Sequence, residues 1–378
     1  MNHYAYLLLN MVLVASCITM SLVFLFFPLQ KAEGLKNYRL SLLFLALTYF
    51  ILALFTVFEF LPAKSLIISF PIELAVISLT AILFTFSLIT LFNSNFANVM
   101  YVLKYMTPTL LYILLTFISD YVWGNISLNS LEDFILHYTH PIAVLNILFL
   151  LFCIAQFIHL FILFRSEARK YELKLDNYFA DTYTLQLRWV RYCFCGGILF
   201  SLFVTASMFS SAPILDWIIT ALEAVFCTVF GLFYIQYPRT YPNIAPILYP
   251  SATVDSQEEE TGYRTLSWEK LKSNIIADKY YLCPEINIEE MAQYLKIGRS
   301  TLSSYINREE KMTFHTWVNK LRIEEAKHLF IDNPDYSIAQ VSDMVGFSEP
   351  SNFSRQFKLI THLSPSVWKQ NQLSKRGE

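Results

Sequence analysis

The stretch IAQVSDMVGFSEPSNFSRQFKLITHLSP, from Ile338 to Pro365, decides the fold of the C-terminal third of the chain. Its apolar residues recur at helical spacing in two short runs, and Gly346 lies between the runs. Pro350 is suited to the first turn of the second run, because that position needs no backbone N–H group. The pattern predicts two short helices joined by a tight turn, the helix-turn-helix arrangement.

An earlier stretch, MAQYLKIGRSTLSSYI from Met291 to Ile306, repeats this pattern. The aligned positions carry similar residue types at an offset of 50 or 51: Met291 and Val341, Ala292 and Ser342, Leu295 and Val345, Ile297 and Phe347, Leu302 and Phe353, Ile306 and Phe357. The small residue in each copy lets its two helices cross closely, and the larger ones close a small core. The sequence therefore predicts two helix-turn-helix units.

A long amphipathic helix is predicted between the two copies, from Thr313 to Ile331. At about 1.5 Å per residue this helix is roughly 28 Å long, close to the ~34 Å between successive major-groove faces on one side of DNA. Two units held this far apart can read adjacent grooves. The alternative is an all-helical module that binds another protein.

These residues resemble the C-terminal domain of AraC/XylS-type bacterial transcription regulators, over about residues 268–371. The resemblance rests on these elements of the second copy: Ile338-Ala339, Val345-Gly346-Phe347-Ser348, Ser351, Phe353, Arg355, Phe357-Lys358 and Ser364-Pro365. The chain departs from the family at Lys311 and His362, where the family often has glycine, and at Lys369, where arginine is common. The turns at the first two positions are therefore either reshaped or kept left-handed at a cost of about 1 kcal/mol each.

The resemblance implies that the chain binds double-stranded DNA through the second helix of each unit. The DNA-contacting residues that it implies are Arg299, Ser300, Ser303 and Ser304 in the first unit, and Pro350, Ser351, Arg355 and Lys358 in the second. Arg299 and Lys358 are expected near phosphates, and the others near base edges. Among the residues expected near base edges, only Arg355 has the bidentate fork that reads guanine well, although a phosphate contact is its alternative role.

Residues 1–237 differ sharply in composition from the rest. The whole chain is 55% hydrophobic and 15% charged, with a mean hydropathy of +0.43, and the apolar excess lies in this half. Seven stretches are long enough to cross a hydrocarbon core of about 30 Å. They are Tyr4–Phe27, Leu40–Phe60, Ile67–Phe92, Met106–Trp123, Pro141–Phe164, Tyr192–Ser210 and Ile214–Tyr237. The fourth is the weakest, and Lys104 would allow it to begin earlier by snorkelling.

Basic residues in the loops predict the orientation, because Lys and Arg remain on the cytoplasmic side. One set of loops carries eleven of them: Lys31, Lys36, Arg39, Lys104, Arg165, Arg169, Lys170, Lys174, Arg188, Arg191 and Arg239. The opposite loops carry only Lys64, along with the acidic Asp120, Glu132, Asp133 and Asp216. We expect the N-terminus outside and the C-terminal domain in the cytoplasm. With the bacterial resemblance, this predicts a multi-pass protein of the cytoplasmic (inner) membrane.

Ionisable residues within spans are costly and often functional. Glu73, Glu223 and His159 are the candidate sensor residues, and Glu59 lies nearer a span end. With the predicted orientation, the glutamates lie in the outer half of the membrane, where they form a candidate pocket for a cationic or hydrogen-bonding ligand. Snorkelling or pairing between helices is the alternative for the glutamates, and interhelical hydrogen bonding is the alternative for His159.

The predicted organisation is all-α: a seven-transmembrane-helix sensor domain over 1–237, a linker over 238–264, and a soluble DNA-binding domain over 265–378, in which a long helix joins the two helix-turn-helix units. The linker is proline-rich at Pro238, Pro242, Pro246 and Pro250, which favours an extended, semi-rigid spacer, and then acidic. Residues 265–378 carry 15 Lys or Arg against 14 Asp or Glu, a net charge of +1, so a single copy should bind DNA weakly. A homodimer is therefore expected.

No nucleotide-binding loop, catalytic triad or metal-ligand cluster is evident in the soluble half. We therefore expect no enzyme activity, no cofactor and no metal. The combined expectation is a membrane-embedded regulator that couples an unidentified small-molecule or membrane signal to transcription. The alternative is a membrane receptor or transporter-like protein whose helical tail binds protein. Signalling without cleavage and proteolytic release of the tail are both compatible with the linker.

Overall fold

The computed structural model describes residues 3–29, 35–59, 69–93, 96, 98–124, 126, 135–182, 185–207, 213–238, 242, 244 and 267–376. Within these residues the chain is helical, and the one β-type feature is an isolated bridge between Phe179 and Asn287. The all-α prediction is therefore confirmed. The chain forms two compact units, which are residues 1–169 with 187–248 and residues 170–186 with 249–378.

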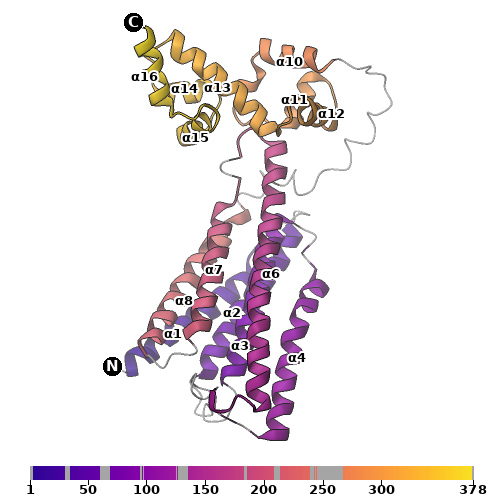
Figure 1. The fold of residues 1–378 in the computed structure, drawn as a ribbon, viewed down its shortest axis with the longest axis vertical. Coiled ribbons are helices and arrows are strands. Elements are labelled where there is room, and N and C mark those ends of the chain that lie inside the picture. Colours follow the sequence, from indigo (N-terminus) through magenta and orange to yellow (C-terminus); the bar gives the residue numbers. More distant parts are fainter. Residues whose placement is uncertain are drawn as a thin grey trace. The chain divides into compact units, whose positions relative to one another are not determined.

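Seven helices of the described chain are long and apolar enough to cross a bilayer. They are α1 (His3–Phe26), α2 (Leu35–Glu59), α3 (Ser69–Phe92), α4 (Val99–Trp123), α6 (Pro141–Tyr178), α7 (Arg188–Ser207) and α8 (Pro213–Tyr234), all labelled in Figure 1. Helix α4 begins seven residues before the predicted Met106, and Pro108 lies within it. The expected earlier start is thus confirmed.

Helix α6 differs from its prediction, because it does not end at Phe164 but continues to Tyr178. The switch from apolar to charged residues after Phe164 marks the end of the apolar run and does not end the helix. The added turns place Tyr171, Leu175 and Tyr178 at spacings of four and three, and all three side chains are buried. From Lys170 onwards this extension belongs to the second compact unit.

Polar side chains join the helices of the first unit within an apolar surrounding. The Ser78 hydroxyl of α3 donates to Gln156 Oε1 of α6 at 2.8 Å and lies 2.7 Å from the Thr109 hydroxyl of α4. The Tyr49 hydroxyl of α2 donates to the carbonyl of Cys227 in α8 at 2.7 Å. Hydroxyl and amide groups commonly join helices in this way where no water is present.

The second compact unit holds nine helical segments after the α6 extension, all within 267–376. They are α10 (Trp268–Ala277), η3 (Tyr280–Leu282), α11 (Ile288–Leu295), α12 (Arg299–Tyr305), η4 (Ile306–Glu310), α13 (Phe314–Asp332), α14 (Ile338–Met344), α15 (Pro350–Thr361) and α16 (Pro365–Arg376). Figure 1 shows α11 with α12 at one end of α13, and α14 with α15 at the other. Both helix-turn-helix units and the connecting helix are therefore where the repeat predicts them.

The two helix-turn-helix units begin in the same way. Asn287 and Glu290 form a reciprocal capping box at the start of α11, and Ser337 and Gln340 form another at the start of α14. Each box satisfies backbone N–H groups that a helix start leaves without partners. The small residues of the repeat, Ala292 and Ser342, are 2% and 1% exposed, as close helix crossing requires.

Positive φ angles occur where the family usually has glycine. Lys311 has φ +54° and His362 has φ +62°, so both keep the left-handed turn at the cost expected for a side chain. Lys369, which stands where arginine is common, donates to the Tyr336 carbonyl at 2.7 Å and lies over the Phe330 ring. These departures leave the fold of the second helix-turn-helix unit intact.

Arg322 of α13 is fully buried and fastens the loop formed by η3 and Cys283 to the core. Its Nε donates to the Tyr281 carbonyl at 2.8 Å, and its Nη2 donates to the Cys283 carbonyl at 2.7 Å. Burial lowers the pKa of Arg322 to about 10, so its guanidinium is still protonated at neutral pH. Gly346 lies against the same loop with φ +83°, where a Cβ atom would be 2.3 Å from the Leu282 carbonyl oxygen.

Candidate functional site

The DNA-contacting residues implied for the second helix-turn-helix unit lie along one side of α15. Pro350, Ser351, Arg355 and Lys358 are all exposed, and they recur at helical spacing. The opposite side of α15 packs into the core through Phe353 and Phe357, which are both 0% exposed. The helix therefore presents a polar ridge containing a guanidinium and an ammonium group, a composition that fits a DNA groove.

Helix α12 presents a less cationic surface. Ser300 and Ser304 are exposed, whereas Arg299 and Ser303 are half-buried. Ser303 accepts a hydrogen bond from Asn307 at 3.2 Å, and the Arg299 guanidinium lies 5.8 Å from the centre of the Tyr178 ring. Hydroxyl groups bond to several bases, so α12 is suited to weaker sequence discrimination than α15.

The packing of α13 against α15 and against the loop after α6 involves residues that the sequence did not single out. His315 and Asn319 of α13 are buried beside Gln356 of α15, and the side-chain amides of Asn319 and Gln356 both lie within hydrogen-bonding distance of a His315 ring nitrogen. The carbonyl of Ala180 accepts from His315 Nδ1 at 2.6 Å, and the Asp181 carboxylate accepts from Asn352 at 2.9 Å. A loop between predicted spans gives no sequence signal for such contacts.

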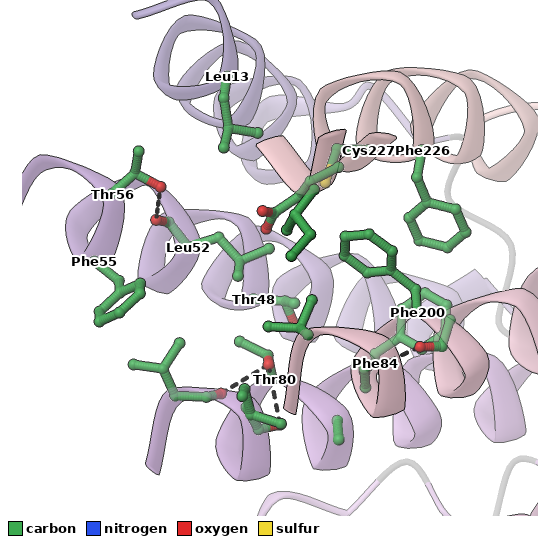
Figure 2. A pocket seen from close by; sticks show the side chains of 18 of the residues that line it. Leu13, Thr48, Leu52, Phe55, Thr56, Thr80, Phe84, Phe200, Phe226 and Cys227 are labelled. Atoms are coloured by element: carbon green, nitrogen blue, oxygen red, sulfur yellow. Dashed lines mark hydrogen bonds between the residues drawn. The ribbon is translucent and has the colours of Figure 1, made fainter. Parts of the chain in front are cut away.

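A separate cavity of about 650 Å³ lies within the first compact unit, among the seven apolar helices. Side chains from α1, α2, α3, α6, α7 and α8 line it, and Figure 2 shows Leu13, Thr48, Phe84 and Cys227 among them. Its wall is mostly aromatic, aliphatic and hydroxyl-bearing. A concave apolar site with a few polar groups is the usual form of a small-molecule site.

The cavity brings together two of the three candidate sensor residues. Glu73 of α3 and Glu223 of α8 both line it, together with Asp216. No Lys, Arg or His is found among the described lining residues. Asp216 was expected in an outside loop, and its position near the start of α8 gave no sign of a role in the cavity.

His159 lies elsewhere. It is on an exposed face of α6, its Nε2 is 3.0 Å from the Tyr105 hydroxyl of α4, and the two rings are stacked. This geometry matches the alternative role of an interhelical hydrogen bond. The Glu59 side chain, Glu132, Asp133, the loop residues Lys31, Lys64 and Arg239, and the linker from 245 to 264 lie outside the described residues.

Residues 291–371 match the model of a helix-turn-helix domain family. The C-terminal part of the chain is an AraC-type helix-turn-helix domain. Its curated relatives include the Msm operon regulatory protein of Streptococcus mutans, which is 27% identical over 115 residues, 30% of this chain and 40% of the relative. The regulatory protein PocR of Salmonella typhimurium is 25% identical over 101 residues, 27% of this chain and 33% of the relative.

An uncharacterized HTH-type transcriptional regulator of Staphylococcus aureus is 31% identical over 85 residues, 22% of this chain and 11% of the relative. The chain thus spans well under half the length of each of these relatives. No solved structure matches the chain. The likeness concerns the helix-turn-helix domain, and the seven apolar helices are argued from their own residues.

Proposed function

We propose that this chain is a membrane-embedded transcription regulator, which binds double-stranded DNA through α12 and α15 and couples a membrane signal to gene expression. One observation carries the proposal: a single chain combines seven helices suited to a bilayer with an AraC-type helix-turn-helix domain. The bacterial relatives of the C-terminal domain favour an inner-membrane location, and the basic loops favour an N-terminus outside with the DNA-binding domain in the cytoplasm.

The cavity supplies the proposed signal-binding site. Carboxylates are costly in a membrane interior, and a cavity that places Glu73, Asp216 and Glu223 among apolar and hydroxyl-bearing side chains favours a ligand with a cationic or hydrogen-bonding group. A ligand shifts an equilibrium only through different affinities for two arrangements. The cavity meets that requirement because six helices contribute to it, so a change in their packing changes the site.

The DNA-binding form is proposed to be a homodimer. The net charge of residues 265–378 is only +1, and much of the affinity of such domains for DNA is electrostatic. Two domains joined through the membrane half bind the second half-site at a raised effective concentration. The signal then acts by changing how two intact chains present their domains to DNA.

Two measurements test this proposal. Topology reporters fused after Trp123 or Trp217 should be active outside, and reporters fused after Lys174 or Arg239 should be active inside. Occupancy mapping of the tagged chain in its own cells should recover a limited set of promoter sites, and these should disappear when α12 and α15 are deleted. A cytoplasmic N-terminus, or recovery of protein partners with no enriched DNA, would contradict it and favour a protein-binding tail.

A further inference from the structure

The segment from Lys170 to Gln186, which comprises the end of α6 and the loop before α7, belongs to the same compact unit as the helix-turn-helix domain. It folds back on itself, because the Tyr171 hydroxyl donates to the Leu185 carbonyl at 2.9 Å. We call its central residues, Tyr178 to Asp181, the docking segment. This segment contacts both helix-turn-helix units and the helix between them.

The docking segment contacts the first helix-turn-helix unit through its backbone and one aromatic ring. Phe179 and Asn287 form an antiparallel bridge, and the Ala180 N–H donates to the Ile286 carbonyl at 3.0 Å. The Tyr178 hydroxyl donates to the Glu289 carboxylate, and its ring faces the guanidinium of Arg299. Arg299 is the residue of α12 expected to approach a DNA phosphate, so Tyr178 occupies one side of that guanidinium.

Contacts with α13 centre on the carbonyl of Ala180. This oxygen accepts from His315 Nδ1 at 2.6 Å and from Asn319 Nδ2 at 3.2 Å. His315 Nε2 then serves as the acceptor for Gln356 Nε2 of α15, at 3.2 Å. Burial lowers the pKa of His315, which agrees with a neutral imidazole that donates through one nitrogen and accepts through the other.

The docking segment contacts the second helix-turn-helix unit through the carboxylate of Asp181. One oxygen accepts from the Ser348 hydroxyl at 2.6 Å, and the other accepts from Asn352 Nδ2 at 2.9 Å. Asn352 Oδ1 in turn accepts from Arg355 Nη2 at 2.9 Å. Asp181 is therefore linked through a single side chain to the guanidinium expected to read guanine, beside the N-terminal turn of α15.

We infer that the docking segment and DNA compete for the same face of the domain. A carboxylate near the start of α15 takes the position that favours an anion, because helix N-termini and hydroxyl groups there commonly bind DNA phosphates. While the segment is docked, Asp181 repels an approaching phosphate, Arg355 is bonded to Asn352, and Tyr178 covers one side of Arg299. DNA binding then requires release of the segment.

This inference rests on the proposed DNA binding and adds a way to regulate it. Helix α6 is a single helix from Pro141 to Tyr178, so it leads directly from an apolar span into the docking segment. Only the undocked fraction binds DNA, and the apparent affinity falls by that fraction. A signal that rotates or shifts α6 therefore changes DNA affinity without cleaving the chain.

Full-length protein in lipid nanodiscs and a fluorescent random-sequence duplex of about 40 base pairs at low salt test the inference, because nonspecific affinity needs no known promoter. Asp181→Ala should tighten binding roughly tenfold. The double variant His315→Ala, Asn319→Ala should also tighten it several-fold, since it removes docking contacts without removing an acidic side chain. Glu172→Gln is the matched control, because it removes one negative charge from the same helical extension outside the docking segment, and should change affinity less than twofold.

Thermal unfolding followed by circular dichroism confirms that each variant is folded, and a variant that does not fold is replaced by Ala180→Pro, which removes the N–H donor to Ile286. Unchanged or weaker binding by the folded variants would overturn the inference, since the segment would then be inert or would support the DNA-competent form. Tighter binding by Asp181→Ala alone would also overturn it, as a simple charge effect. If no protein binds the duplex, wild type included, the proposed function itself fails.

Discussion

The Asp181 carboxylate accepts a hydrogen bond from the side chain of Asn352, which is 171 positions later in the chain, at 2.9 Å. Asn352 is fully buried, although its neighbours Ser351 and Arg355 on α15 are exposed. The bond therefore joins the loop between two apolar helices to the helix expected to read DNA. It makes the loop an element of the DNA-binding unit as well as a connection between spans.

Arg355→Ala is expected to abolish recognition at one half of the binding site, at a cost of about 1–3 kcal/mol, because Arg355 carries the bidentate fork on α15. The measurement is the affinity for a series of single-base variants of an occupied promoter site. Lys358→Ala is the comparison, since loss of a phosphate contact weakens all sequences about equally and lowers the salt slope by about 1. A uniform loss with Arg355→Ala would assign that residue to phosphate.

Glu73→Gln and Glu223→Gln are each expected to lock or blunt the response of a target promoter to its signal. Both carboxylates line the cavity, and glutamine keeps their size while removing the charge that the ligand is proposed to meet. Promoter activity is compared across the conditions that change it in wild type. His159→Gln, on an exposed face outside the cavity lining, should respond normally, and an unaltered response in both glutamate variants would remove the cavity from the mechanism.

Gly346→Ala is expected to destabilise the C-terminal domain by about 2 kcal/mol or more. A side chain there must adopt φ +83° and meets the Leu282 carbonyl oxygen at 2.3 Å. Gly298→Ala is the matched control, because the nearest atom to its added Cβ is 3.6 Å away, and it should change stability by less than about 1 kcal/mol. Limited proteolysis of the intact chain with rising denaturant measures both. Equal free energies of unfolding for the two variants would show that η3 moves away from the added methyl group at little cost.

The docking segment should be released as the pH falls. Burial lowers the pKa of docked His315, although Asp176 and Asp181 oppose this effect and Arg355 adds to it. An undocked histidine titrates near ~6.5, so the undocked state binds more protons below that pH, and docking weakens from there towards the lowered docked value. The affinity ratio between Asp181→Ala and wild type should therefore shrink from about pH 7.5 to about pH 5.5. A ratio that is constant or grows would contradict this assignment.

The sequence predicted the helix-turn-helix units well because their signals are local. The spacing of Met291, Leu295 and Leu302, and of their counterparts after Ile338, is determined by helix periodicity and by contacts within each repeat. At Lys311 and His362 the family resemblance left open whether the turns are reshaped or kept left-handed, and the structure has a positive φ at both residues. Apolar length likewise predicted the seven long helices.

The remaining features depend on contacts between distant parts of the chain. The extension of α6 was hidden because its charged residues resemble an ordinary cytoplasmic loop, and the spacing of Tyr171, Leu175 and Tyr178 was its only local signal. Asp181 bonds to side chains more than 160 positions away. Glu73 and Glu223 were singled out by their cost in a membrane, yet only the packing of the helices brings them to one cavity.

In the proposed function, an intact chain that is still in the membrane binds DNA. Cells carrying one chain with an N-terminal tag before α1 and a different C-terminal tag after α16 test it most directly. After crosslinking under inducing conditions, DNA recovered through each tag is compared at the same promoters, with immunoblots for shorter fragments. We expect equal enrichment through both tags and a single full-length band. Promoter DNA recovered only through the C-terminal tag, with a soluble fragment of the size of the tail, would contradict it.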